Sequence, residues 1–271
     1  MALFEELQSL MVKYRFRPEK KLSQYFCINE ALLRFLAIKA ELKSTDVVIE
    51  LGAGTGFLTK FLLEKCKVIA IEKDEVMIAL LQEKFKQEII DGKLELIKGD
   101  FLEQDIDKLG ANKIVSLPPY HISSEIVAKT ILSNIKQAIF VFDTGFIEKI
   151  IAFEGFKEYS ALTVFLNVNA KVEVLEKIEK SSFFPNPNCV STVIKMNFDR
   201  QNNSKEFYAF LKEIFRHKNK DFSRALKQSR NYLEKQIKIN KKIVDEMNFT
   251  EKVYAIPPEE FLDIFEDMTS K

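Results

Sequence analysis

Short runs of β-branched and other apolar residues alternate with amphipathic stretches between residues 46 and 145. Five of these runs have the length and composition of strands: 46–51, 67–72, 94–100, 113–117 and 137–143. Strands that alternate with helices form a parallel sheet with right-handed crossovers and helices on both faces. The pattern therefore predicts an α/β fold with a Rossmann-like sheet.

The pattern changes beyond residue 160. Residues 161–178 and 191–198 predict further strands, antiparallel and at one edge of the sheet. A polar stretch at 199–206 follows, and the spacing then predicts helices to the end, with Pro257-Pro258 opening the last one. We therefore predict two domains, 1–200 with the sheet and a small helical domain at 201–271.

Composition excludes several classes of protein. The chain has 271 residues, 46% hydrophobic and 30% charged, which suits a globular protein of one or two domains. Apolar runs are too short for a membrane span, and the N-terminus lacks a signal-peptide pattern. Three distant cysteines and two histidines argue against disulfides and metal sites. We expect a cytoplasmic protein with no membrane and no metal.

Basic residues gather in two places although the net charge is only +1. The N-terminal segment 13–30 opens with Lys13, Arg15, Arg17, Lys20 and Lys21. A second cluster comprises Arg216, Lys218, Lys220, Arg224, Lys227 and Arg230. Either cluster alone is compatible with a solvated helix face. Together, flanking a catalytic domain, they favour a partner with a phosphate backbone.

A glycine loop follows the first predicted strand. The sequence Glu50-Leu51-Gly52-Ala53-Gly54-Thr55-Gly56 holds three of the eight glycines in the chain. Glycine allows a sharp turn there and lets a ligand approach the backbone closely. A dinucleotide fingerprint would need glycine at position 57, where Phe57 stands. The spacing therefore favours a single nucleoside-like ligand.

Three acids lie at the ends of the first three predicted strands, where a parallel sheet binds its ligand. Glu72 is placed to accept hydrogen bonds from both hydroxyls of a ribose, and Asp100 from an adenine amino group. Glu50 is placed to face a positively charged part of the ligand. Each acid alone is also compatible with a helix cap. With the glycine loop, they predict an S-adenosylmethionine site, in preference to NAD.

The fourth predicted strand ends in Leu117-Pro118-Pro119-Tyr120, which we call the lip. An aromatic amine is a poor nucleophile because its lone pair is delocalised. A site that accepts both amine hydrogens lets the nitrogen become pyramidal and aim that lone pair at a methyl donor. Carbonyl oxygens of a rigid turn can do so, and a neighbouring aromatic ring can stack on the base. The alternative is a proline-terminated strand with a packing tyrosine.

These motifs resemble the KsgA-type dimethyladenosine transferases of small-subunit ribosomal RNA, in particular the archaeal and eukaryotic branch. The resemblance runs from about Lys20 to Arg230. Besides the loop, the acids and the lip, it includes Lys21 to Phe26 (KLSQYF), Ser182 to Pro187 (SFFPNP) and Phe215 to Lys220 (FRHKNK). The Erm-type ribosomal methyltransferases share the catalytic part. The resemblance implies a class I methyltransferase fold.

The resemblance also implies roles for individual residues. Gln24, Tyr25 and Cys27 would flank the methionine end of the cofactor, with Gly52 and Gly54 beneath it. Tyr120 would stack on the target adenine, with Phe183 or Phe184 against its other face. The basic residues would bind ribosomal RNA through its phosphates; we single out Arg216, Lys218, Lys220 and Arg224.

The lip departs from the family at one position. Relatives carry asparagine or aspartate where this chain has Leu117, so a side-chain acceptor of one amine hydrogen is missing. Losing such an acceptor costs about 1–3 kcal/mol, or roughly 5- to 150-fold in rate. Ser116 could replace it only if the strand slipped by one residue, which would reverse the side-chain faces. Ser23, Tyr25 and Cys27 are smaller departures near the cofactor.

The leading hypothesis is S-adenosylmethionine-dependent N6-methylation, mono- or dimethylation, of adenines in small-subunit ribosomal RNA or a pre-ribosomal small subunit. We expect a monomer. Because of Leu117, one alternative is a catalytically weakened or inactive RNA-binding factor in ribosome assembly. Another is methylation of a different amine, in DNA, another RNA or protein.

Overall fold

The computed structural model describes residues 3–19 and 24–270. Contacts within the chain define two compact units. The first comprises residues 1–126, 133–144 and 172–197, and the second comprises 127–132, 145–171 and 198–271. The second unit thus includes a segment from the middle of the chain. The domain division predicted at residue 200 stays a prediction.

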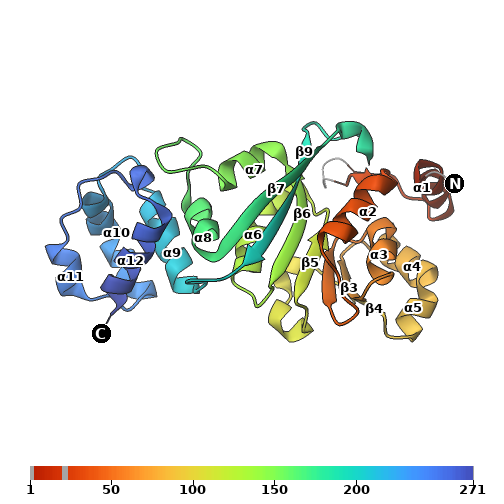
Figure 1. The fold of residues 1–271 in the computed structure, drawn as a ribbon, viewed down its shortest axis with the longest axis horizontal. Helices are drawn as coiled ribbons and strands as arrows, with labels where there is room; N and C mark the ends of the chain where they lie inside the picture. The colour runs from red at the N-terminus through yellow and green to blue at the C-terminus, as the bar shows by residue number, and fades with distance from the viewer. Residues whose placement is uncertain (1–2, 20–23, 271) are drawn as a thin grey trace. The chain divides into compact units, whose positions relative to one another are not determined.

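The described part of the first unit is built around a seven-stranded sheet in the order β4-β3-β2-β5-β6-β9-β7 (Figure 1). The pairs β4–β3, β3–β2, β2–β5 and β5–β6 are parallel, and β9 is antiparallel to β6. The strands are β2 Val47–Leu51, β3 Lys67–Glu72, β4 Leu94–Lys98, β5 Lys113–Ser116, β6 Gln137–Asp143, β7 Ala170–Ile178 and β9 Ser191–Phe198. The predicted Rossmann-like sheet is confirmed, with five parallel strands where the sequence predicts them.

The chain enters this sheet in the middle, at β2. It proceeds to β3 and β4 on one side and then returns to β5 and β6 on the other. A crevice therefore opens between the loops that follow β2 and β5, the place where such sheets bind ligands. β2 is suited to the centre because its residues 48–51 are all buried, as in strands covered on both faces.

Helices surround the sheet, and α3 and α4 pack on β3 and its neighbours (Figure 1). Asp74 starts α4 by accepting hydrogen bonds from the N–H groups of Val76 and Met77. The helices before the lip are α1 Leu3–Lys13, α2 Glu30–Lys39, α3 Phe57–Leu63, α4 Glu75–Lys84 and α5 Lys86–Ile90, with the 3₁₀ turns η2 Phe101–Glu103 and η3 Ile106–Leu109. The lip is followed by η4 Tyr120–Ile122 and α6 Ser123–Ile131.

A small antiparallel sheet joins the N-terminal segment to residues far along the chain. β1, Phe26–Cys27, pairs with β8, Phe183–Phe184, with Cys27 opposite Phe183. The turn η5, Lys180–Ser182, precedes β8. This pairing places the segment around Gln24 and Tyr25 in the first unit together with the glycine loop.

The prediction of a strand over residues 161–178 is wrong in its first half. Residues 161–169 form the helix α8, Ala161–Asn169, and only the second half forms β7. Ser160 starts this helix by accepting from the N–H of Thr163. Eight of its nine residues are buried, so its apolar run has no polar face that would reveal a helical period. Its β-branched residues favoured a strand, and burial within the second unit overrides that preference.

The second unit is a helical bundle with an aromatic core. Rings of α9 contact rings of α12, as in the pairs Phe207–Phe265 and Phe210–Phe265 at 5.1 and 5.4 Å. The buried Tyr159 hydroxyl donates to the carbonyl of Ile256 at 2.9 Å. The elements are α7 Thr144–Ile150, which starts in the first unit, then α8, α9 Lys205–Phe215, α10 Phe222–Gln236, α11 Lys241–Glu246, η6 Val253–Ala255 and α12 Pro258–Thr269. The helix predicted after Pro257-Pro258 is confirmed.

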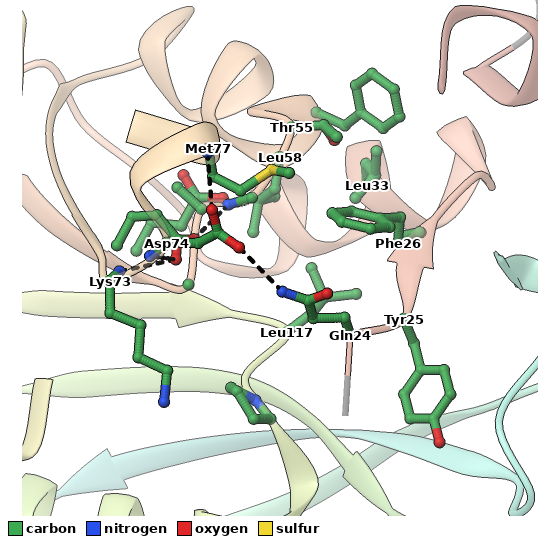
Figure 2. Close-up of a pocket in the computed structure, with 18 residues that line it drawn as sticks. Gln24, Tyr25, Phe26, Leu33, Thr55, Leu58, Lys73, Asp74, Met77 and Leu117 are labelled. Atoms are coloured by element: carbon green, nitrogen blue, oxygen red, sulfur yellow. Dashed lines mark hydrogen bonds between the residues drawn. The ribbon is translucent and has the colours of Figure 1, made fainter. Parts of the chain in front are cut away.

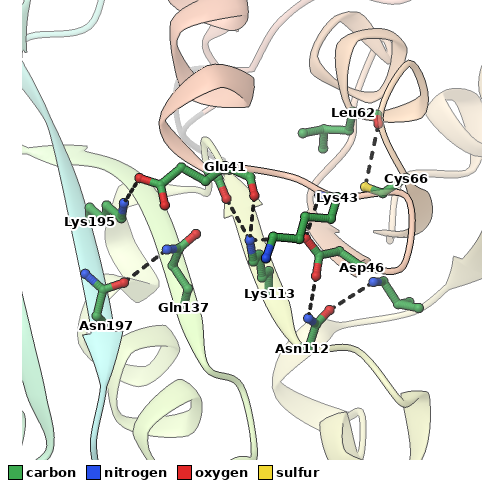
Figure 3. A network of polar contacts seen from close by, with 12 residues as sticks. Glu41, Lys43, Asp46, Leu62, Cys66, Asn112, Lys113, Gln137, Lys195 and Asn197 are labelled. Atoms are coloured by element: carbon green, nitrogen blue, oxygen red, sulfur yellow. Dashed lines mark hydrogen bonds and ion pairs between the residues drawn. The ribbon is translucent and has the colours of Figure 1, made fainter.

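Polar side chains join the strands at the end of the sheet where β2 and β5 begin (Figure 3). Lys113 lies 3.1 Å from Asp46 and donates to the carbonyls of Ala40 and Glu41. Asn112 also donates to Asp46. On β9, the buried Lys195 pairs at 2.7 Å with the exposed carboxylate of Glu41. This network lies away from the carboxyl ends of the strands and contributes to the fold.

Candidate active site

The glycine loop connects β2 to α3 through three left-handed residues. The φ angles of Gly52, Gly54 and Gly56 are +63°, +54° and +73°. L-residues rarely adopt such angles. A Cβ at Gly54 would lie 3.2 Å from the ring of Phe26, so this glycine also allows β1 to lie close. The loop therefore exposes backbone along one wall of a cavity.

Glu72, at the end of β3, is held by three backbone N–H groups. Its Oε2 accepts from Gly54 at 2.9 Å, and its Oε1 accepts from Lys73 and Asp74 at 2.8 and 2.9 Å. Asp74 accepts in turn from the side-chain amide of Gln24 at 3.3 Å (Figure 2). These bonds fix a pair of carboxylates that a ligand carrying hydroxyl groups can engage.

Glu50 ends β2 beneath the same loop and is 3% exposed. Burial raises its pKa from the ordinary 4.5 to about 8, against the effect of a hydrogen bond from Thr59, and the charge of Glu72 raises it further. The Thr59 hydroxyl donates to Glu50 at 2.6 Å. A positive charge brought into the cavity would favour the ionised form of this carboxyl.

These groups line a cavity of about 230 Å³ (Figure 2). The predicted cofactor and lip residues that line it include Gln24, Tyr25, Cys27, Glu50, Gly52, Gly54, Glu72 and Leu117. Pro119 of the lip lines it too. Acids together with apolar side chains such as Leu58 and Met77 line the cavity, a combination that suits a positively charged nucleoside ligand. The cavity fits S-adenosylmethionine.

The cavity also has lining residues that the sequence analysis missed. They are Phe26, Leu33, Ala53, Thr55, Phe57, Leu58, Lys73, Asp74 and Met77. Asp74 carried a usable signal, because it lies two residues past the acid at the end of the second strand and can cap the next helix. No such signal marks Phe26, whose position depends on the pairing of β1 with β8, or Leu33, which lies on α2.

Asp100 is the predicted cofactor residue that the structure leaves outside the cavity lining. Its carboxylate accepts from the N–H of Leu102 at 2.8 Å and starts the turn η2. The helix-cap alternative thus describes its present contacts. Asp74 and Met77, from the neighbouring α4, line the cavity instead.

The lip leaves the sheet directly after β5. Ser116 is fully buried, donates to the carbonyl of Leu51 at 2.7 Å and does not line the cavity. The register of β5 with β6, Val115 opposite Ile139, shows no slip. Leu117 lines the cavity and packs against the core. Neither residue 116 nor residue 117 therefore offers a side-chain acceptor there.

Tyr120 is held beside the lip by polar and aromatic contacts. Its hydroxyl lies 2.6 Å from the hydroxyl of Ser191, and its carbonyl accepts from Ser123. The ring lies 6.1 Å from that of Tyr25, centroid to centroid. Burial raises the pKa of Tyr120, so the phenol stays protonated. Pro118 and Tyr120 do not line the cavity itself.

The two phenylalanines predicted to contact RNA have different surroundings. Phe183 is 1% exposed and belongs to the core, so it offers no face to a base in this conformation. Phe184 is partly exposed and packs edge-on against Phe4, with centroids 5.2 Å apart. Of the two, only Phe184 is accessible for stacking.

The second basic cluster lies on α9, α10 and the turn between them, in the second unit. Arg216 pairs with Glu213 at 3.2 Å, and Arg224 with Asp221 at 3.4 Å. Lys218 donates to the carbonyl of Lys157, and Lys220 donates to Gln228. Of the N-terminal cluster, Lys20 and Lys21 lie outside the described residues, as do Leu22 and Ser23 of the motif, while Lys13 pairs with Glu83.

In the part of the chain that the structure describes, no helix is long and apolar enough to cross a membrane. The same residues contain no group of three or more His, Cys, Asp or Glu side chains that could hold a metal ion. Burial raises the pKa of the Cys27 thiol in the cavity wall to about 12.

The fold, the glycine loop and the acids at the strand ends define a class I methyltransferase that uses S-adenosylmethionine. The family model described as ribosomal RNA adenine dimethylase matches residues 15–270. The chain belongs to this family.

Relatives and solved structures agree with that assignment. A probable ribosomal RNA small subunit methyltransferase A of Methanopyrus kandleri is 31% identical, over 97% of each chain. One of Methanococcus maripaludis is 35% identical over 90% of this chain and 95% of its own. A dimethyladenosine transferase from Plasmodium falciparum has a TM-score of 0.73 at 26% identity, covering 88% of this chain and 95% of its own. The 23S rRNA methyltransferase ErmE, at 21% identity and TM-score 0.63, shares the fold over 90% of this chain and 100% of its own.

The expectations drawn from the resemblance are thereby confirmed for the family, the fold class, the enzyme class and the cofactor. The site residues and the division into domains stay predictions.

Proposed function

We propose that this protein methylates N6 of adenines in small-subunit ribosomal RNA, with the lip as the acceptor site. The observation that carries the proposal is that Leu117 and Pro119 line the same cavity as Gly52, Gly54 and Glu72. The methyl donor and the acceptor amine would thus meet at one wall. S-adenosylmethionine, when bound, supplies an electrophilic methyl group on a positively charged sulfur.

The residues of the chain divide the remaining work. Glu72, already bonded to three N–H groups, would orient the ribose, and Glu50 would face the positive charge. Tyr120 would stack on the adenine, which must leave any helical stack to reach the lip. Backbone carbonyls of Pro118 and Pro119 would accept an amine hydrogen.

The basic side chains Arg216, Lys218, Lys220 and Arg224 would bind phosphates of the RNA. The side chains of Arg216 and Arg224 are themselves 70% and 77% exposed, although Glu213, the partner of Arg216, is buried. Ion pairs of such exposed cations contribute little, so both guanidinium groups can also contact phosphates. The logarithm of the RNA binding constant falls linearly with the logarithm of the salt concentration. Each lost phosphate contact makes this fall less steep by about one unit of slope. The Lys218→Ala and Lys220→Ala variants test this role.

We further propose that the substrate is a pre-ribosomal small subunit and that the protein acts as a monomer.

Methyl transfer tests the proposal directly. Small subunits that lack the modification are incubated with the protein and methyl-labelled cofactor, and their nucleosides are separated by mass. We expect label in N6-methylated adenosine. A Tyr120→Ala variant should bind the cofactor normally and lose most of this label. Proven cofactor binding without any labelled adenosine would contradict the proposal.

Leu117 favours a second candidate, an assembly factor with little or no activity. Its apolar side chain lines the cavity, and the Ser116 hydroxyl is bonded elsewhere. If this candidate is right, Leu117→Asn creates activity that the native protein lacks. Clear activity of the native protein in the labelling assay would refute it.

A further inference from the structure

Two tyrosine rings lie close together where the lip meets the cofactor cavity. The ring centroids of Tyr25 and Tyr120 are 6.1 Å apart, and the ring planes are inclined by 32°. Tyr25 lines the cavity. Tyr120 directly follows Pro119, the lip residue that also lines it. The space between the two rings therefore adjoins the wall where the methyl donor and its acceptor would meet.

Tyr120 is the more firmly held of the two rings. Its hydroxyl lies 2.6 Å from the hydroxyl of Ser191, and its carbonyl accepts from Ser123 at 2.8 Å. Tyr25 is half-buried, and among the residues that the structure describes no hydrogen bond fixes its hydroxyl. Its ring extends away from Asp74 (Figure 2). The Tyr25 ring can therefore shift while the Tyr120 ring stays in place.

The separation of the rings is close to what a flat base needs. Stacked bases lie about 3.4 Å apart, so a base between two parallel rings requires centroids roughly 7 Å apart. The observed 6.1 Å is short of this by about 1 Å. A small outward shift of Tyr25, together with a rotation that makes the two rings parallel, opens a slot for one base.

The phenylalanines that the resemblance implies for the second face of the base are less suited to it. Phe183 is 1% exposed and belongs to the core. Phe184 packs edge-on against Phe4, with centroids 5.2 Å apart. Both belong to β8, whose pairing with β1 positions the adjoining Tyr25. The ring that lies beside Tyr120 in this structure is that of Tyr25.

We propose that the target base inserts between Tyr25 and Tyr120 and stacks on both rings. This inference rests on the proposed function, because it assumes a base at the lip. Stacking on two faces fixes the plane of the base, so that the lip carbonyls meet its amine in one orientation. Stacking tolerates any base, so the choice of adenine stays with the groups that contact the amine.

The test compares side chains at position 25 in the labelling assay, with S-adenosylmethionine at saturation. Tyr25→Leu keeps an apolar side chain but removes the ring, and should lower kcat/KM for the small subunit roughly 5- to 150-fold, the usual effect of one lost base stack. Tyr25→Phe keeps the ring and should stay within about twofold of the native protein, since stacking needs no hydroxyl. Tyr232→Leu, at a 42% exposed tyrosine of α10, is the matched control and should be fully active.

Cofactor binding separates this role from a purely cofactor-binding one. Titration with S-adenosylhomocysteine shows that each variant is folded and gives its Kd, which should change much less than kcat/KM. A loss confined to this Kd, or equal activity of Tyr25→Leu and Tyr25→Phe, would overturn the inference while the proposed function stands. So would a loss in Phe184→Leu that Tyr25→Leu does not show, because Phe184 would then be the second ring. A native protein that labels no adenine would refute the proposed function and this inference with it.

Discussion

At the scale of single residues, the acids show how far a position at the end of a strand predicts that a side chain lines the cavity. Glu50 and Glu72 line the cavity as their positions at the carboxyl ends of strands predicted. Asp100 has the same kind of position but caps its own 3₁₀ turn. A sequence pattern places a residue at the edge of the sheet, whereas the local turn decides where its side chain bonds. That decision depends on backbone geometry that no spacing encodes.

The protonation of Glu50 gives a prediction for stability. The folded protein retains a proton on this carboxyl up to about pH 8, whereas the unfolded chain releases it near pH 4.5. The free energy of unfolding should therefore fall as pH rises between these values. Glu50→Gln removes this contribution, so its unfolding midpoint should change less with pH than that of the native protein. Urea titrations at pH 5, 6.5 and 8 compare the two; parallel pH profiles would show the assignment to be wrong.

At the scale of elements, the five parallel strands were predictable because each is a short run with several apolar residues that is followed by a turn or loop. Residues 161–169 were not, because a helix buried on nearly every side loses the polar face that marks its period. The strand β1 could not be predicted either, because its two residues are positioned only by pairing with β8, more than 150 residues further along the chain.

Gly56, in the turn into α3, can be compared with Gly110, which follows η3. A Cβ at Gly56 would lie 2.4 Å from the Phe85 ring, whereas one at Gly110 would meet no atom within 4 Å, and both residues have positive φ. Gly110→Ala should cost about 1 kcal/mol from backbone strain alone. Gly56→Ala should cost about 1–3 kcal/mol more, because the Phe85 ring must move. Chemical denaturation measures both, and equal losses would mean that the Phe85 contact is relieved without cost.

The polar network where β2 and β5 begin offers a comparison of two lysines, the half-buried Lys113 and the buried Lys195. Lys113→Met leaves the buried Asp46 with its bonds from Asn112 and Lys43, and should cost about 2 kcal/mol, less than the roughly 3–5 kcal/mol of a fully isolated charge. Lys195→Met leaves Glu41, which is 70% exposed and can be hydrated, so its cost should be near zero. Denaturant midpoints of both variants give the comparison. A larger loss for Lys195→Met would contradict this view of the network.

At the scale of the whole molecule, the cofactor cavity lies within the first unit, while the second basic cluster lies within the second. A ligand that binds only the folded state stabilises it by about 2.7 kcal/mol at 100 times its Kd. We expect S-adenosylmethionine to slow hydrogen exchange in β2, β3 and α4 and to leave α9 and α10 almost unchanged. Exchange mass spectrometry resolves these segments, and equal protection of both units would show that they respond as one.

The sheet also ends in a strand whose outer side has no further strand among the described residues. That strand, β7, carries Glu173, Glu176 and Lys177 among mostly exposed positions. Charged side chains on an edge strand oppose pairing with a strand of another molecule, because such pairing would remove the charges from water. We therefore expect the outer side of β7 to disfavour aggregation when many copies are made at once.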